Sequence, residues 1–220
     1  MTSHQTGARR SIPSATDSDR GSRERIFCTA EQLFAERGFD RVSLRDITAA
    51  ADVNLAAVNY YFGSKDQLLL EIFRTRAAEL NRERAQLLQQ AIDENAERPG
   101  VRAILAALIT PSTRWISDER RVALQFLIRA RSEGNAQIRE ILCHNVAHLR
   151  RFIEALQRAL PDLSRRDIMW RLHFTLAVLH RNSAEDYERL RVLSDGACAP
   201  DDREALLKRL LDYTSAGFAA

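Results

Sequence analysis

The stretch NLAAVNYYFGSKDQL, residues 54–68, decides the fold of the N-terminal part of this chain. It gathers two asparagines, two tyrosines, one phenylalanine and one of the only two lysines in the 220-residue sequence. Asparagine is a favoured helix N-cap, and glycine commonly follows a helix C-terminus. Asn54 and Gly63 therefore predict a short helix over residues 55–62. The sequence SKDQ, which starts at Ser64, has the S-x-x-Q form of a capping box and predicts the start of a further helix.

Another short helix is expected directly before this one. Ser43 and Asp46 form an S-x-x-D capping box, and the turn that follows contains Asp52. A first helix is expected from near Ser22 to Gly38, since four apolar residues recur on one helical face. These are Ile26, Ala30, Leu33 and Phe34. Two short helices joined by a tight turn predict a helix-turn-helix.

The composition predicts an all-α protein throughout. Hydrophobic residues make up 45% of the chain and charged residues 29%, whereas there are only 8 glycines and 5 prolines. The net charge of +3 is compatible with a nucleic-acid partner but is a weak indication by itself. Three widely spaced cysteines indicate reduced thiols in a cytoplasmic protein. No apolar run approaches the ~20 residues of a membrane span, so no membrane association is expected.

The rest of the chain continues as helices, about nine in all. Residues 1–21 have almost no large apolar residue and predict a disordered arm, whose arginines are candidates for reaching a DNA groove. After residue 67 the breakers Pro99, Gly134 and Pro161 separate long amphipathic segments. The expected helices span residues 65–95, 101–116, 118–132, 136–160, 165–181 and 184–193, and a last one is capped by Asp201 or Asp202.

In a helix-turn-helix the second helix lies in the major groove, and its early residues meet base edges. Asparagine is able to bond adenine, and alanine or leucine to touch a thymine methyl group. Candidate base-reading residues are Asn54, Leu55, Ala56, Ala57 and Asn59, and candidate phosphate-contacting residues are Ser43, Arg45, Tyr60, Tyr61 and Lys65. Aromatic residues in a small domain are also commonly core residues, and Val58 and Phe62 are expected there. Because acids outnumber bases over residues 22–66, the residues alone leave DNA binding open.

The segment AEQLFAERGFDRVSLRDITAAADVNLAAVNYYFGSKDQLL resembles the N-terminal domain of the TetR family of bacterial repressors. One departure is Asp52, where the family usually has glycine; aspartate tolerates the left-handed turn better than most residues. Within the family, the stretch VNLAAVNYYFGSK and the C-terminal tail are similar to the subgroup around PsrA, a fatty-acid-responsive regulator.

The resemblance implies a DNA-binding domain over residues 22–66 and a ligand-binding and dimerisation domain over residues 67–220. It implies a homodimer that binds double-stranded DNA at a palindromic operator and represses transcription until a small apolar effector releases it. A fatty acid, an acyl-CoA or an aromatic compound is expected as effector. The alternative is a helical protein-interaction module without sequence-specific DNA binding.

The effector is expected among the long helices of the second domain, and a kink at Pro111 is expected to leave space there. Candidate wall residues are Phe73, Leu105, Leu108, Ile109, Phe126, Phe152, Trp170 and Phe174. Arg129 either pairs with an acidic group of the effector or forms an i, i+4 pair with Glu133.

The segment 165–181 is apolar on almost every side, and the last helix has a broad apolar face. A monomer of this size is not expected to bury both, so the two helices and their symmetry mates are predicted to form a four-helix bundle. Candidate interface residues are Leu172, Leu176, Leu179, Leu207, Leu210 and Leu211.

No motif of an enzyme is apparent, and we expect neither catalysis nor a cofactor. His144 and His148 have a spacing compatible with a metal site, but we predict solvated side chains. They share a polar face with Glu140 and Arg151, and no motif of cysteines or carboxylates converges on them. His173 and His180 are expected in the core or at an interface.

Overall fold

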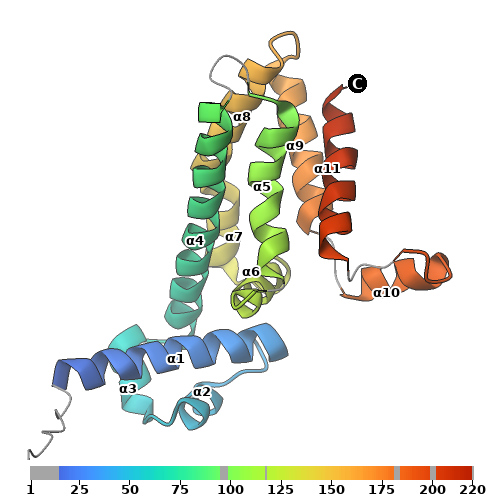
Figure 1. Ribbon diagram of the computed structural model, residues 1–220. Helices are drawn as coiled ribbons and strands as arrows, with labels where there is room; N and C mark the ends of the chain where they lie inside the picture. The colour runs from blue at the N-terminus through green and yellow to red at the C-terminus, as the bar shows by residue number, and fades with distance from the viewer. Residues whose placement is uncertain (1–14, 95–98, 117, 181–183, 199–201, 220) are drawn as a thin grey trace, which may run out of the picture. The chain divides into compact units, whose positions relative to one another are not determined.

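The computed structural model describes residues 15–94, 99–116, 118–180, 184–198 and 202–219. These residues form eleven α-helices and two compact units, which divide between Ile72 and Phe73 within α4 (Figure 1). The all-α fold class is confirmed. The helix count exceeds the expected nine because the predicted helix over residues 136–160 is two helices and the short predicted segment 184–193 is a helix of its own.

The first unit contains α1 (Ala15–Arg37), α2 (Leu44–Ala51), α3 (Leu55–Phe62) and the start of α4 (Lys65–Glu94). The first three helices pack pairwise against one another around a closed core. That core contains the predicted apolar face of α1 together with Phe39, Val42, Ile47, Ala51, Val58 and Phe62, all buried. Because α3 is too short to be a stable helix alone, its packing against α1 and α2 is what holds it in place.

The helix α1 begins at Ala15, earlier than the predicted start near Ser22. Part of the predicted arm, residues 15–21, is therefore helical. The arm residues 1–14, with Arg9 and Arg10, lie outside the described residues.

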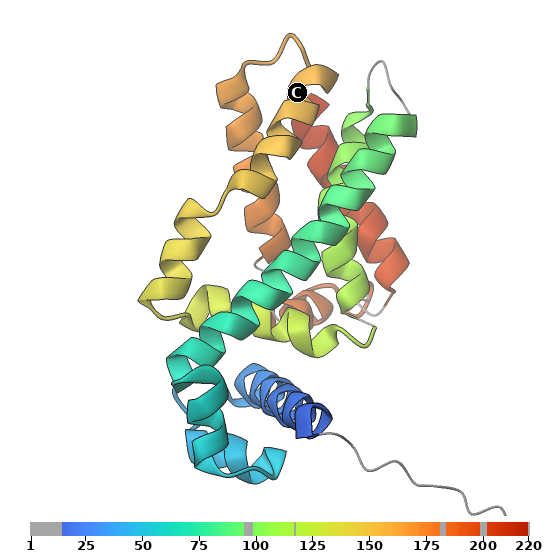
Figure 2. The ribbon, with the colours of Figure 1, turned by 90° about the vertical axis from the view of Figure 1, so that its left-hand side faces the viewer.

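The second unit contains the rest of α4 and seven further helices. Figures 1 and 2 show α5, α8, α9 and α11 side by side, in agreement with the contacts among them. The bounds are α5 Val101–Trp115, α6 Arg121–Glu133, α7 Ala136–His144, α8 Ala147–Ala159, α9 Arg165–His180, α10 Ala184–Leu193 and α11 Arg203–Ala219. As predicted, Asp202 caps α11: its Oδ1 accepts a hydrogen bond from the Ala205 amide at 3.0 Å.

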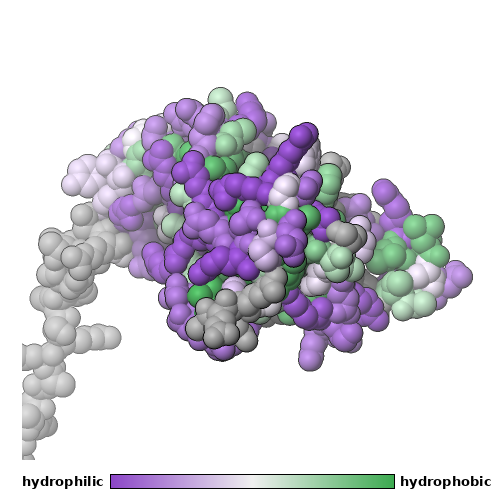
Figure 3. Space-filling model, turned by 90° about the horizontal axis from the view of Figure 1, so that it is seen from above, coloured by the Kyte–Doolittle hydropathy of each residue, from purple (hydrophilic) through white to green (hydrophobic). Residues whose placement is uncertain are grey.

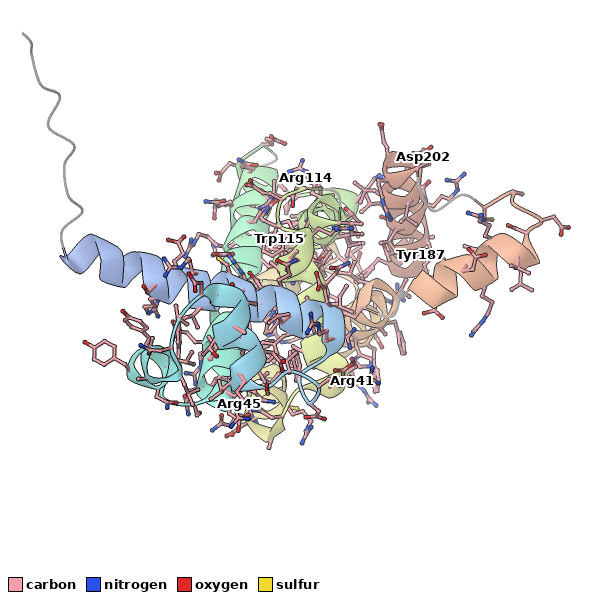
Figure 4. The ribbon with its side chains drawn as sticks, turned by 90° about the horizontal axis from the view of Figure 1, so that it is seen from below. Arg41, Arg45, Arg114, Trp115, Tyr187 and Asp202 are labelled. Carbon is pink, nitrogen blue, oxygen red and sulfur yellow. The ribbon has the colours of Figure 1, made fainter. Side chains whose placement is uncertain are left out.

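A polar junction fixes the C-terminal end of α5. Glu83 of α4 accepts hydrogen bonds from Trp115 Nε1 at 2.9 Å and from Arg120 at 2.8 Å. The Arg120 guanidinium also lies over the Trp115 ring, 4.8 Å from its centre. Trp115 and its neighbour Arg114 are marked in Figure 4. The junction holds α5 against α4 while α5 continues through Pro111 as a helix.

The predicted helix over residues 136–160 breaks at Asn145 and Val146, and Figure 2 shows the two resulting helices at an angle. The Asn145 amide closes α7 by donating to the Ile141 carbonyl at 2.8 Å. A seam of apolar residues continued through this point in the sequence, and for that reason periodicity alone predicted one helix. The break lets α7 and α8 take different directions around the cavity described below.

No helix among the described residues has both the length and the apolar character required to cross a bilayer.

Candidate DNA-binding surface and ligand cavity

The two faces of α3 differ sharply in exposure. Val58 and Phe62 are buried, whereas Leu55 is 45% exposed and Tyr60 is 78% exposed. Of the predicted DNA-contacting residues, seven are exposed, namely Ser43, Arg45, Asn54, Leu55, Ala56, Asn59 and Tyr60; Tyr61 and Lys65 are half-buried. The outward face of α3 thus combines small, amide and phenolic side chains.

Two of these residues also shape the helices that carry them. Asn54 is the N-cap of α3, and its Oδ1 accepts a hydrogen bond from the Ala57 amide at 2.8 Å. Ser43 forms the predicted capping box of α2 with Asp46, whose carboxylate accepts from the Ser43 amide at 2.8 Å and its hydroxyl at 2.6 Å. These bonds from Ser43 lower the pKa of Asp46. Asp52 takes the left-handed conformation at φ 52°, as expected for the turn.

Basic and aromatic groups flank this surface. Arg41 and Arg45 are exposed, in the loop before α2 and in its first turn (Figure 4). The Tyr60 and Tyr61 rings meet edge to face with centres 5.0 Å apart. Exposed arginines and phenolic hydroxyls are groups that commonly contact DNA phosphates.

Lys65 has a structural role that the sequence did not reveal. Its ammonium group donates hydrogen bonds to the Phe39 carbonyl at 2.8 Å and to the Val42 carbonyl at 2.9 Å. The side chain therefore ties the start of α4 to the loop that leads into α2. Arg23 ties α1 in a comparable way, through an ion pair with Glu71 and a stacking contact over Phe62.

The second unit contains a cavity of about 400 Å³, within the usual size range of small-molecule sites. Residues of α4, α6, α7, α8 and α9 line it, together with the break at Asn145 and Val146. Most of its walls are apolar. Its polar groups are amides, arginines and histidines, and none of the described residues that line it is a carboxylate.

Arg84 is the most deeply buried charged residue of this wall, with 2% of its surface exposed. Its guanidinium donates to the Leu108 carbonyl and the Ser112 hydroxyl, both at 2.9 Å, and to Asn81 Oδ1 at 3.3 Å. Burial and the nearby charge of Arg131 lower the pKa of Arg84 to about 10, so it stays charged at pH 7. The side chain is held rigidly between α4 and α5.

Arg131 and two histidines complete the basic part of the wall. Arg131 is an exposed residue that lines the cavity, and the protein around its guanidinium lowers its pKa. Burial, followed by the charges of Arg84 and Arg131, lowers the pKa of His148 to about 4. Burial and the same two charges lower the pKa of His180 to about 3. Both imidazoles are neutral at pH 7.

Most of the predicted effector-binding residues do not line this cavity. Of the nine, only Phe73 lines this cavity. Trp170 and Phe174 are exposed on α9, and Arg129 forms the alternative pair with Glu133 at 2.6 Å. The other five, Leu105, Leu108, Ile109, Phe126 and Phe152, are buried core residues that line none of the described cavities. They sit at the inward positions of closely packed helices, so their apolar character serves the core.

The histidine interpretation also needs correction. His144 is exposed, as predicted, but His148 lines the cavity and is not a solvated residue. His148 precedes the buried Phe152 by one helical turn, and this places it on the inner side of α8. No cluster of metal-ligand residues occurs within the described ranges.

The predicted interface leucines lie deeper than expected. Leu172 and Leu211 are buried, and the other four, Leu176, Leu179, Leu207 and Leu210, are partly buried against the core of the second unit. The exposed apolar residues of α9 and α11 are instead Met169, Trp170, Phe174 and Tyr213. Phe174 and Tyr213 border a groove of about 370 Å³ between residues of these two helices.

Two family models match the sequence. One, described as bacterial regulatory proteins of the tetR family, matches residues 26–72. The other, described as a tetracyclin repressor-like C-terminal domain, matches residues 106–217, more than half of the chain.

Curated relatives match over part of their length. The HTH-type transcriptional repressor Rv3405c of Mycobacterium tuberculosis is 33% identical over 110 residues, which are 48% of this chain and 56% of that protein. The HTH-type transcriptional repressor KstR2 of Rhodococcus jostii is 31% identical over 97 residues, 44% of each chain. The chain thus spans about half the length of these relatives.

Solved structures share the fold over nearly the whole chain. NalD, the secondary repressor of the MexAB-OprM multidrug efflux pump in Pseudomonas aeruginosa, has a TM-score of 0.57 at 21% identity and covers 92% of this chain and 97% of its own. A TetR-like transcriptional regulator from Rhodococcus sp. RHA1 has a TM-score of 0.59 at 19% identity, covering 94% of this chain and 100% of its own.

The Lys65 clamp predicts a local loss of stability when its charge is removed. Replacing Lys65 by Met leaves two carbonyls without their charged donor, and we expect this to destabilise the loop before α2 by about 1–3 kcal/mol. Amide hydrogen exchange over residues 38–53, measured by mass spectrometry, should become about tenfold faster or more. The chain's other lysine provides the control, because Lys208 forms an exposed pair with Asp212. Lys208→Met should leave amide exchange over residues 38–53 nearly unchanged. Equal effects of the two variants would refute the clamp.

The neutral histidines predict that the second unit loses stability in mild acid. The unfolded chain binds protons at His148 and His180 below about pH 6.5, whereas the folded chain resists protonation until far lower pH. Stability should therefore fall from pH 7 to pH 5, a change measured by melting the full chain with tryptophan fluorescence. His180→Leu should flatten this dependence, and the exposed His144→Leu should not. A slope that His180→Leu leaves intact would show that other groups cause it.

Proposed function

The chain belongs to the TetR family of transcriptional regulators, which is not a family of enzymes, and from this premise we propose that it is a DNA-binding repressor. It acts as a homodimer on a palindromic operator, and a small molecule in the cavity of the second unit releases it. The exposed face of α3 is the observation that carries this proposal. In α3 only Val58 and Phe62 are buried, so six of its eight residues remain at least partly available to a duplex.

The chemistry of that face suits direct reading of bases. Leu55 and Ala56 present apolar groups for thymine methyls, and the exposed Asn59 presents an amide for adenine. Asn54 uses its side-chain oxygen as the helix cap but retains its amide donors. Tyr60 and Arg45 are exposed and available to phosphates on either side. The two hydrogen bonds of Lys65 to the Phe39 and Val42 carbonyls support a role in positioning the loop before α2. The third N–H of its ammonium group remains available to a phosphate.

A homodimer would provide two recognition helices for two half-sites, which are one helical turn of DNA apart, about 34–36 Å. We assign the dimer interface to the exposed face of α9 and α11. Trp170 and Phe174 stack there with ring centres 5.8 Å apart, and Tyr213 is 69% exposed. Large exposed aromatic groups on neighbouring helices are typical of subunit interfaces. The leucines that the sequence predicted at the interface would then pack in the core behind this exposed face.

The release mechanism is proposed to run through α4. This helix is continuous from Lys65, next to α3 in the chain, to the cavity residues Phe73, Leu80 and Arg84. A ligand that favours one position of α4 alters the spacing of the two recognition helices in a dimer. A coupling of about 1–3 kcal/mol is enough to change operator affinity by roughly 5–150-fold. Placement in the PsrA-like subgroup remains part of this proposal and rests on the similarity of residues 53–65 and of the C-terminal tail.

The DNA-binding proposal is tested by gel shift with the region upstream of the protein's own gene. The parent chain should bind it as a dimer, and Arg45→Ala should weaken binding to all sequences and reduce the salt slope by about 1 per protomer. Asn59→Ala should instead relax preference at one base pair per half-site. Gln125→Ala, an exposed amide on α6, is the matched control and should bind like the parent. Sequence-independent binding by the parent would favour an interaction module instead.

The dimer proposal predicts that a charge on the α9 face separates the subunits. Phe174→Glu should convert the dimer to a monomer in sedimentation velocity at micromolar concentration, because the carboxylate would be buried without a partner. Val192→Glu is the control, since Val192 is 67% exposed on α10. Figure 3 shows apolar residues gathered at the right edge of the molecule. A monomer from Val192→Glu with an intact dimer from Phe174→Glu would move the interface to α10.

A further inference from the structure

We propose that the cavity of the second unit selects ligands by charge: it takes a small molecule with an apolar body and one anionic head group, which binds against Arg84 and Arg131. This inference rests on the proposed function only for the ligand's role as effector. The binding site itself rests on the geometry of the cavity. The head group is a carboxylate or a phosphate monoester, two anions that share the same hydrogen-bonding partners.

The distribution of charge around the cavity carries the inference. Arg84 and Arg131 both line it, and within the described ranges neither forms an ion pair with a carboxylate. The nearest acid to exert a charge effect on Arg84 is its neighbour Glu83, which is engaged with Trp115 and Arg120. Arg84 is buried and its charge is compensated only by neutral hydrogen-bond acceptors, which is unfavourable compared with an anionic partner. An anion in the cavity removes this penalty, whereas a neutral ligand of the same shape leaves it in place.

The two arginines are suited to different parts of recognition. Three N–H groups of Arg84 are already bonded to Leu108, Ser112 and Asn81, so the guanidinium is held in place before a ligand arrives. Arg131 has no such bonds to described residues and keeps its planar set of donors for a head group. Fixed charge from Arg84 and free donors from Arg131 make a preorganised anion site.

The remaining polar groups add donors without adding charge. His148, His173 and His180 line the same cavity, and the pKa values of His148 and His180 are lowered enough for both rings to be neutral at pH 7. A neutral imidazole is able to donate one hydrogen bond to an anion and does not raise the charge of the wall. The apolar body of the ligand is accommodated by the opposite walls, which include Phe73 and Leu142.

A second cavity, of about 300 Å³, shares the same basic wall. Both cavities are lined by Leu80, Arg84, Leu127, Arg131 and His180. The second cavity continues beneath α10 and α11, and Tyr187, marked in Figure 4, is among its lining residues. Its other walls are mainly apolar. The anionic head group is therefore the fixed point of binding, and apolar space lies on both sides of it.

The test measures direct binding to the full chain without DNA, by calorimetry at pH 7. The probes are decanoate, decyl phosphate and the neutral 1-decanol, with 4-phenylbutyrate and 4-phenylbutanol as an aromatic pair. At least one anion should bind the parent chain about tenfold or more tightly than its own alcohol, as expected for charge-assisted bonds. Whichever of decanoate and decyl phosphate binds more tightly identifies the head group. No anion binding more tightly than its alcohol would overturn the proposal.

Arg131→Met locates the site, with Arg129→Met on the same helix as its matched control. Arg129 is paired with Glu133 and does not line the cavity. Arg131→Met should reduce the preference for the anion about fivefold or more, and the charge of Arg84 should supply what remains. Arg131→Lys should retain more of the preference than Arg131→Met, and Arg129→Met all of it. A preference in Arg131→Met equal to that of the parent would overturn the assignment.

These measurements separate the inference from the repressor proposal. Anion-selective binding together with a failed gel shift would leave the charge-selective cavity standing and remove its role as an effector site. A successful gel shift with no preference for anions would leave the repressor and reject the charge-selective cavity.

Discussion

The packing of Val58 and Phe62 against α1 and α2 is the constraint on which the N-terminal unit depends. An eight-residue helix is too short to persist alone in water, so α3 exists because these two side chains are buried. Once they are fixed, the helical period turns Ala56 and Tyr60 outward and places Asn59 at the edge of the buried face. Leu55 shares the side of Val58 and Phe62, but it is the first residue of α3 and stays 45% exposed. The buried core and the exposed face of α3 are therefore set by the same packing, and a change of register on α3 would disturb both.

The sequence predicted this unit well because its determinants are local. The caps at Ser43 and Asn54 and the left-handed turn at Asp52 are short-range signals, and the structure reproduces each of them. The Lys65 clamp was missed because its acceptors are carbonyls of Phe39 and Val42, more than twenty residues away in sequence. Backbone acceptors of this kind leave no mark on side-chain pattern.

Apolar character alone does not identify the residues that line the cavity of the second unit. Residues such as Leu105 and Phe152 are apolar because they are buried, and most buried positions belong to the close-packed core. A better signal was available. Arg84, Arg131 and His180 each follow an inward-facing leucine by four residues, namely Leu80, Leu127 and Leu176, so each stands in the apolar stripe of its own helix. A basic residue in such a stripe indicates a polar site inside the fold.

The cations that hold the first unit together and those that line the cavity of the second unit have different partners. In the first unit, Arg23 is neutralised by Glu71 and Lys65 bonds to backbone carbonyls, so its cations stabilise the fold. In the second unit, Arg84 is buried without a paired carboxylate among the described residues, and this arrangement lowers the stability of the fold. Arg131, which is exposed, likewise has no such pair among the described residues. Natural proteins commonly retain such local penalties where a ligand is bound. The uncompensated charge is thus better explained by binding than by folding.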